Sequence, residues 1–182
     1  GRGLDILGDQ PFPMASTVKI AIVATFLDGV DRGIYSLSSQ YRLLMPLPSR
    51  RFAGRVAPVR AGESLPALTL IELALTRSDN HATDALLRAV GGPRTVNAWL
   101  RRTGNTGLHI DRDIATLVRD DGAIDPAVTV DRRDSTTPLA MVRLLSGLYR
   151  GQWLSPESQE VLLGAMSRCV TGRHRMRADL PE

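Results

Sequence analysis

The stretch PFPMASTVKIAIVATFL, residues 11–27, contains a serine and a lysine that could do chemistry together. Lys19 is the only lysine among the 23 lysine and arginine residues of the chain. If the apolar run around it forms a helix, Ser16 and Lys19 lie on one face, because residues three positions apart are neighbours there. A serine hydroxyl needs a base to become a nucleophile. A lysine amine can be that base where burial and a helix N-terminus lower its pKa, whereas arginine does not deprotonate.

The structural alternative for this pair is a capping serine beside a lysine whose stem covers apolar surface. A second motif, RSDNHA, favours chemistry. It places Ser78, Asp79 and Asn80 at a break between two predicted helices. These are good turn residues, but a second serine could also pass a proton to a leaving group, and the amide of Asn80 could contact a substrate carbonyl. S-x-x-K followed by S-D-N is the combination found in class A β-lactamases and penicillin-binding proteins.

The chain resembles the class A serine β-lactamases, within the penicillin-recognising serine hydrolases, over nearly its whole length. The segments PFPMASTVKI, LTLIELALTRSDNHATDALL, VGGPRTVNAWLRRTGNTGLHIDR and DRRDSTTPLAM carry the resemblance. It implies that Ser16 is the acylated nucleophile and Lys19 its general-base partner. It further implies that Ser78 is a proton shuttle and that Asn80 contacts the substrate amide.

The resemblance also implies an ion pair between Arg112 and Asp134 at the base of an Ω-loop; ordinary surface charges are the alternative for both. It implies a structural role for Asp79. The expected substrate is a β-lactam or a peptidoglycan-like peptide, with no metal or other cofactor. A periplasmic or secreted location follows from the family.

The predicted Ω-loop, residues 105–134, departs from the family pattern R-x-E-P-x-L-N. Counted from Arg112, the glutamate position holds Ile114 and the asparagine position holds Val118, and no glutamate occurs between Glu72 and Glu157. The loop is also longer than is usual in the family. Its carboxylates could position a hydrolytic water or could simply be solvated charges: Asp113, Asp120, Asp121 and Asp125.

This departure separates two steps of the reaction. The residues for acylation are present, but deacylation needs a base that activates water. We therefore expect a β-lactam to acylate Ser16 and to be released slowly. One alternative is a penicillin-binding or D-alanyl-D-alanine peptidase-like protein, in which the missing glutamate is expected. Another is a non-catalytic relative that uses the scaffold for binding.

Composition argues against several other classes of protein. The net charge is only +4, aromatic residues make up 4%, and no basic stripe is interleaved with stacking aromatics, so nucleic-acid binding is not expected. A single cysteine provides neither a disulfide nor a metal-ligand pattern. No apolar run reaches the roughly 18 residues of a membrane span.

Periodicity and end signals predict a mainly helical protein. Helices are expected over residues 16–28, 68–76, 81–90 and 93–104, the first with a Ser16 or Thr17 cap. Two more are expected to begin with Thr137-Pro138 and Ser155-Pro156, because proline fits the first turn of a helix. Residues 105–134 have little periodicity, and residues 3–7 and 55–59 are weak strand candidates.

The predicted fold is the helical lobe of the α/β fold shared by β-lactamases and penicillin-binding proteins. We expect one catalytic domain over residues 1–182, truncated at both ends. By the resemblance, we expect most of the antiparallel sheet and the strand with the family's K-T-G motif to lie outside this sequence. Complementing β-strands, or a further chain segment, are therefore expected as partners.

Overall fold

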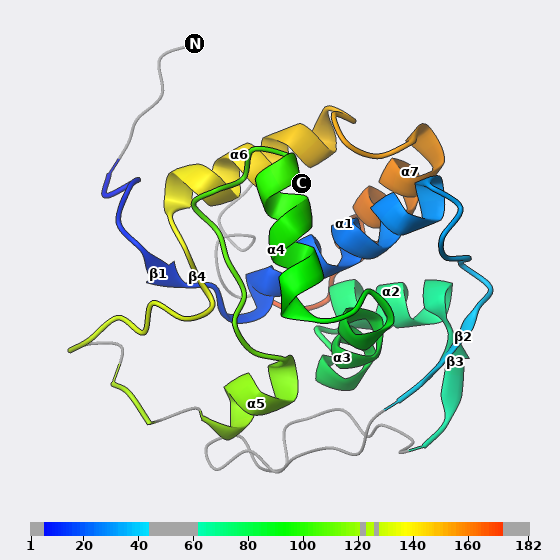
Figure 1. Ribbon diagram of the computed structural model, residues 1–182, viewed down its shortest axis with the longest axis horizontal. Coiled ribbons are helices and arrows are strands. Elements are labelled where there is room, and N and C mark those ends of the chain that lie inside the picture. The colour runs from blue at the N-terminus through cyan, green and yellow to red at the C-terminus, as the bar shows by residue number, and fades with distance from the viewer. Residues whose placement is uncertain (1–5, 44–61, 121–122, 126–127, 173–182) are drawn as a thin grey trace.

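The computed structural model describes residues 6–43, 62–120, 123–125 and 128–172 (Figure 1). Its helices are α1 Val18–Asp31, α2 Ala67–Thr76, α3 Asn80–Ala89, α4 Pro93–Arg102, α5 Ile114–Arg119, α6 Pro138–Tyr149 and α7 Pro156–Ser167. A 3₁₀ turn, Ala15–Thr17, leads directly into α1. The short strands are β1 Phe12–Pro13, β2 Gln40–Arg42, β3 Ser64–Pro66 and β4 Ser135–Thr136.

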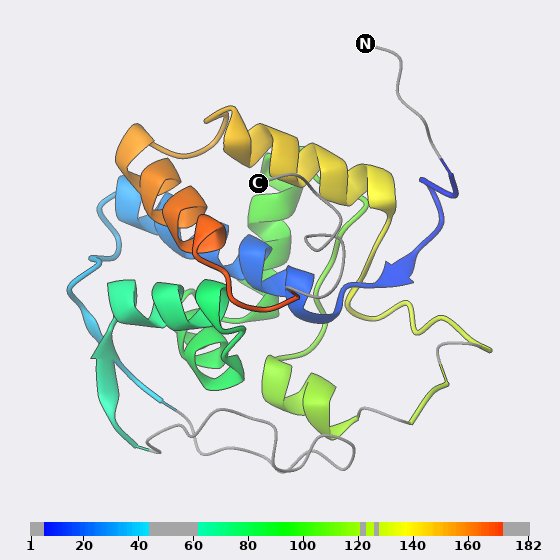
Figure 2. The same cartoon turned by 180° about the vertical axis from the view of Figure 1, so that it is seen from behind.

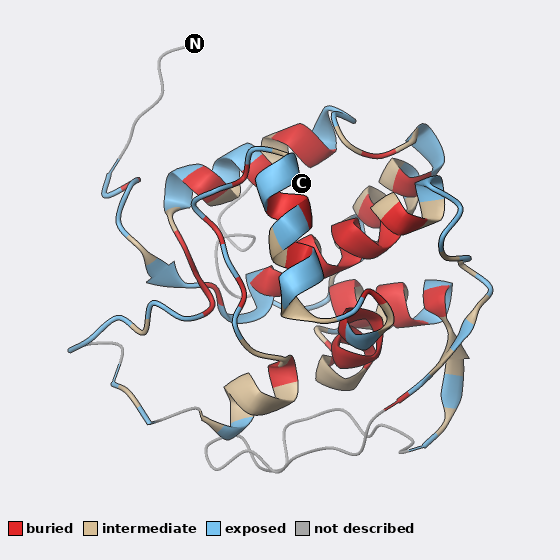
Figure 3. Ribbon diagram, in the orientation of Figure 1, coloured by how far each residue is buried: buried red, intermediate tan, exposed pale blue. Residues whose placement is uncertain are grey.

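Helix α1 is the centre of the molecule. It packs against α2, α3, α4 and α7, with α4 on one side in Figure 1 and α7 on the other in Figure 2. Almost the whole of α1 has the colour of buried residues in Figure 3. Ile22, Phe26 and Leu27 are among its fully buried side chains. This agrees with the sequence, because a helix that is apolar all round must be covered all round.

The end signals are confirmed at α6 and α7. The Thr137 hydroxyl accepts a hydrogen bond from the Ala140 N–H, and the Ser155 hydroxyl accepts one from the Ser158 N–H. Proline is the first residue of both helices. The expected side-chain cap on α1 is wrong: Thr17 donates its hydroxyl to the Met14 carbonyl, 2.6 Å away, and the preceding 3₁₀ turn takes the place of a cap.

Two small antiparallel sheets support the helices. β1 pairs with β4, with Phe12 opposite Thr136 and Pro13 opposite Ser135. β2 pairs with β3, with Tyr41 opposite Leu65. Of the strand candidates, residues 55–59 lie outside the described part of the chain, and Ile6 and Leu7 lie in a bend. Pairing of β1 with β4 brings the segment before Ser16 next to the end of the predicted Ω-loop.

The described part of residues 105–134 contains a helix, α5, that the lack of periodicity did not predict. This helix has six residues, too few for an amphipathic pattern to repeat. The sequence does contain a start signal for α5, because aspartate is a favoured N-cap residue. Asp113 accepts a hydrogen bond from the Thr116 N–H at 2.7 Å.

The described residues form a predominantly helical unit with two minor sheets, which confirms the predicted fold class. The core is aliphatic, with Trp99 and Phe26 as its large aromatic members. Within the described ranges, no helix combines the length and hydrophobicity needed to cross a membrane.

Candidate active site

Ser16 lies in the 3₁₀ turn that precedes α1, and its side chain is exposed. The turn is held from outside, because the Met14 N–H donates to the Asp134 carbonyl at 3.0 Å. Ala15 has a positive φ of 46°, a conformation that costs free energy for any residue with a Cβ. The chain thus presents Ser16 on a strained, tightly held turn.

Lys19 is one turn further along and only 2% exposed. Its Nζ donates to Oγ of Ser78 at 2.9 Å and to Oδ1 of Asn80 at 2.7 Å, and also to the backbone carbonyl of Ser78. Burial lowers the pKa of Lys19 from 10.5 to about 8, although the negative charges of Asp79 and Asp84 act in the opposite direction. The amine can therefore lose a proton close to neutral pH.

Ser78 connects the two residues of the first motif. It occupies the break between α2 and α3 with a positive φ of 57°, and its Oγ donates to Oγ of Ser16 at 2.9 Å. Asp79 caps α3 by accepting from the Ala82 N–H, and Asn80 is the first residue of that helix. The four residues to which the resemblance assigned chemistry thus meet at one point, where Lys19 contacts Ser78 and Ser78 contacts Ser16.

A cavity of about 250 Å³ opens beside this cluster. Ser16, Lys19 and Asn80 form its polar side. The wall that α5 contributes is apolar: Ile114, Leu117 and Val118. No carboxylate is among the described residues that line the cavity.

Of the four aspartates considered as a base for water, the three that the structure describes do not line this cavity. Asp113 caps α5 and Asp120 accepts from the side chains of Arg112 and Arg119, so both carboxylates have partners away from the cavity. Asp125 does not line the cavity, and Asp121 is outside the described residues.

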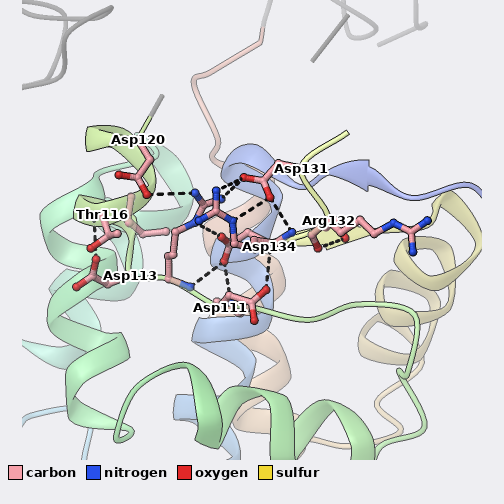
Figure 4. Close-up of polar contacts among 12 residues, drawn as sticks. Asp111, Asp113, Thr116, Asp120, Asp131, Arg132 and Asp134 are labelled. Carbon is pink, nitrogen blue, oxygen red and sulfur yellow. Dashed lines mark hydrogen bonds and ion pairs between the residues drawn. The ribbon is translucent and has the colours of Figure 1, made fainter. Parts of the chain in front are cut away.

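The base of the α5 segment is held by the guanidinium of Arg112. Its Nε donates to Oδ2 of Asp134 at 2.6 Å, and its terminal nitrogens contact Asp120 at 3.4 Å and Asp131 at 3.2 Å. Figure 4 shows these three labelled carboxylates arranged around it. Asp134 is 2% exposed and also accepts from the backbone N–H groups of Asp111 and Arg112. The cluster closes the segment that ends at β4.

Sequence reasoning missed one residue near the site, Asp84. This carboxylate on α3 is 3% exposed and accepts from the backbone N–H groups of Ile114 at 2.7 Å and Ala115 at 2.8 Å. Burial raises its pKa from 3.8 to about 6. The available signal was its spacing, since Asp84 follows Asn80 by four positions and therefore shares its face of α3.

Comparison with known proteins identifies the family of the chain. The chain matches the β-lactamase enzyme family over residues 1–182. It is similar to a crystal structure of a β-lactamase from Xanthomonas campestris, with 30% identity and a TM-score of 0.82 over 98% of this chain and 63% of that one.

Two further solved structures are similar. An ancestral class A β-lactamase has 35% identity and a TM-score of 0.81, covering 100% of this chain and 66% of that one. The chromosome-encoded β-lactamase of Vibrio parahaemolyticus has 31% identity and a TM-score of 0.79, covering 98% and 65%. The chain thus spans somewhat less than two thirds of the length of these relatives. On the family match and these likenesses, the chain belongs to the class A serine β-lactamase family.

Proposed function

We propose that this chain carries the acylating half of a serine β-lactamase-type hydrolase, in which Ser16 attacks the amide carbonyl of a β-lactam. The observation that carries the proposal is the pair of 2.9 Å contacts from Lys19 to Ser78 and from Ser78 to Ser16. They form a continuous path for a proton from the nucleophile to a buried amine.

In the proposed acylation, neutral Lys19 accepts a proton from Ser78 while Ser78 accepts the proton of Ser16. Before this transfer, the Ser16 hydroxyl donates to Ser78 and the Ser78 hydroxyl donates to the neutral amine. With a protonated lysine both hydrogen bonds run in the opposite direction. Ser16 Oγ bonds to the carbonyl carbon, and as the amide C–N bond breaks the departing nitrogen takes a proton from Ser78, which recovers one from Lys19. Asn80 would contact the substrate amide.

Deacylation is proposed to be slow. Release of the acyl group needs a base that takes a proton from water. Ile114, Leu117 and Val118 cannot do so, and they line the same cavity as Ser16. The same apolar wall favours, as a second candidate, a penicillin-binding or D-alanyl-D-alanine peptidase-like protein that is acylated and hydrolyses poorly.

The family resemblance further supports a periplasmic or secreted location and a small β-lactam or peptidoglycan-like peptide as substrate, with complementing β-strands completing the site. Mass spectrometry of the intact, full-length protein after mixing with benzylpenicillin tests the central step. We expect a persistent adduct on Ser16, absent from Ser16→Ala. Rapid nitrocefin turnover with no lingering adduct would refute slow deacylation, and no adduct at any pH would indicate a binding protein.

A further inference from the structure

The first turn of α5 is held by two carboxylates, of which only one belongs to its own segment. A helix begins with N–H groups that have no partner within the helix. At α5, the Thr116 N–H goes to the side chain of Asp113, its local cap, and the Leu117 N–H to the Asp113 carbonyl. The N–H groups of Ile114 and Ala115 go instead to the two oxygens of Asp84, 30 residues earlier on α3.

Asp84 therefore joins the two walls of the cavity. Asn80 contributes to the polar side, and Asp84 lies one turn further along the same face of α3. Through its two hydrogen bonds, Asp84 holds the start of α5, the helix that contributes the apolar wall of the cavity lined by Ser16. In addition to these hydrogen bonds, α3 packs against α5.

We propose that Asp84 is a positioning residue for the acylation site: as a carboxylate it clamps α5 over the cavity, and its protonation loosens that clamp. An ionised carboxylate accepts at both oxygens, whereas a protonated one carries a hydroxyl whose hydrogen faces an N–H donor. One of the two bonds is then lost. The catalytic part of this inference rests on the proposed function.

The surroundings of Asp84 place its change of protonation state in a pH range that experiments can reach. Burial raises its pKa to about 6, and Asp113 at the start of α5 acts in the same direction. The two backbone hydrogen bonds and the charge of Lys19 on α1 oppose this rise. Asp84 and Lys19 thus influence each other, so the state of the clamp is coupled to the amine that the proposed reaction uses.

Hydrogen exchange of the full chain tests the clamp without any substrate. Protection factors for the amides of Ile114 and Ala115, corrected for intrinsic exchange, should fall about tenfold as pH drops from 7 to 5, because a hydrogen bond to a charged group is lost. In Asp84→Asn, which resembles the protonated side chain, protection should be low at both pH values. Asp31→Asn is the matched control: Asp31 accepts from Ser155 and Ser158 at the start of α7, away from the cavity.

The rate of adduct formation with benzylpenicillin supplies the second readout. The wild-type profile should have an inflection near pH 6 in addition to that of Lys19, and Asp84→Asn should lose it. The same variant should move the Lys19 inflection to lower pH, since a charge that raises the lysine pKa is gone. Asp31→Asn should keep both inflections.

Unchanged protection of Ile114 and Ala115 in the wild type between pH 7 and pH 5 would overturn the proposal, whether or not Asp84→Asn folds. So would an Asp84→Asn profile that matches the wild type. Failure of the wild type to form any adduct would refute the proposed function instead, and the exchange measurement would still decide the role of Asp84.

Discussion

The Oγ atoms of Ser16 and Ser78 lie 2.9 Å apart although the two residues are 62 positions apart in the chain. Both serines are held by strained backbone, at Ala15 with φ of 46° and at Ser78 itself with φ of 57°. A positive φ costs free energy for residues with a Cβ, and such strain is found mainly at functional sites. The contact between the serines is thus maintained although the backbone at Ala15 and Ser78 is strained.

Ser78→Gly should separate the chemical from the structural role of this residue. Glycine adopts a positive φ without strain, so we expect the melting temperature to stay equal or rise slightly. Loss of the proton path should slow adduct formation by about 10²- to 10⁴-fold, the usual contribution of acid–base catalysis. Differential scanning fluorimetry and mass spectrometry measure the two effects. A glycine variant that acylates at the wild-type rate would remove Ser78 from the path.

Lys19→Arg should be folded but unable to form the adduct. Arginine keeps the positive charge and can still donate to Ser78 and Asn80, yet it cannot accept a proton near neutral pH. The larger guanidinium must fit a site that is 2% exposed, so a modest loss of stability is expected as well. Circular dichroism verifies folding, and retained acylation by labelled penicillin would show that Lys19 is not the base.

The pH dependence of stability should report the same lysine. Its pKa is depressed to about 8 in the folded protein from 10.5, so the folded state binds fewer protons than the unfolded chain between these values. The free energy of unfolding therefore rises with pH from about 8 to about 10.5. Below pH 8 the cost of burying the ammonium is fully present, roughly 3 kcal/mol.

Lys19→Met isolates this contribution. Between pH 7 and pH 10.5 the free energy of unfolding of the wild type should rise by roughly 3 kcal/mol, and that of the variant should not. The variant should therefore become less stable relative to the wild type by this amount. Urea titrations at several pH values measure the difference, and the adduct assay should be negative throughout. A pH-independent difference between the two proteins would contradict a depressed lysine pKa.

Much of this arrangement was predictable from the sequence, and the exceptions have physical reasons. The α6 and α7 starts followed from Thr137-Pro138 and Ser155-Pro156, because these signals are local. α5 was missed because six residues cannot repeat an apolar pattern. The clamp by Asp84 was missed because its partners are backbone N–H groups of another segment, and backbone donors leave no mark in a sequence.

The predicted side-chain cap on α1 was wrong for a related reason. Serine and threonine at 16 and 17 have the composition of an N-cap, but the chain enters α1 through a 3₁₀ turn in which those side chains are used otherwise. Thr17 bonds back to Met14, and Ser16 meets Ser78. Here a local rule was overridden at the proposed nucleophile, where such exceptions are expected.

Asp134 should be the most sensitive residue of the cluster in Figure 4. Asp134→Ala would leave the N–H groups of Asp111 and Arg112 and the buried side of the Arg112 guanidinium without their acceptor. Breaking such a pair costs about 3–5 kcal/mol. Asp134→Asn retains one acceptor and tolerates the positive φ of 52°, so it should lose less. Chemical denaturation gives both values; equal effects would mean that the charge, not the backbone contacts, dominates.

Ile114→Glu should shorten the lifetime of the acyl-enzyme. Ile114 stands on the α5 wall of the cavity, so a carboxylate there can reach a water beside the Ser16 ester. Burial and the nearby Asp84 would raise the pKa of the new glutamate, while Lys19 would lower it. We expect deacylation to accelerate by about 10- to 100-fold, with roughly 1–3 kcal/mol lost from the free energy of unfolding because a 4% exposed apolar side chain is replaced.

Val118→Glu provides the matched control, since it adds the same group to the same wall one turn further from the start of α5. The lifetime of the benzylpenicillin adduct, followed by mass spectrometry after removal of free penicillin, distinguishes the two. Faster release from both variants would mean that opening or charging the wall is sufficient. Faster release from Ile114→Glu alone would assign the effect to a base held at the first turn of α5, where Asp84 fixes the backbone. An unchanged lifetime in Ile114→Glu, with acylation intact, would contradict the view that the missing glutamate limits this site.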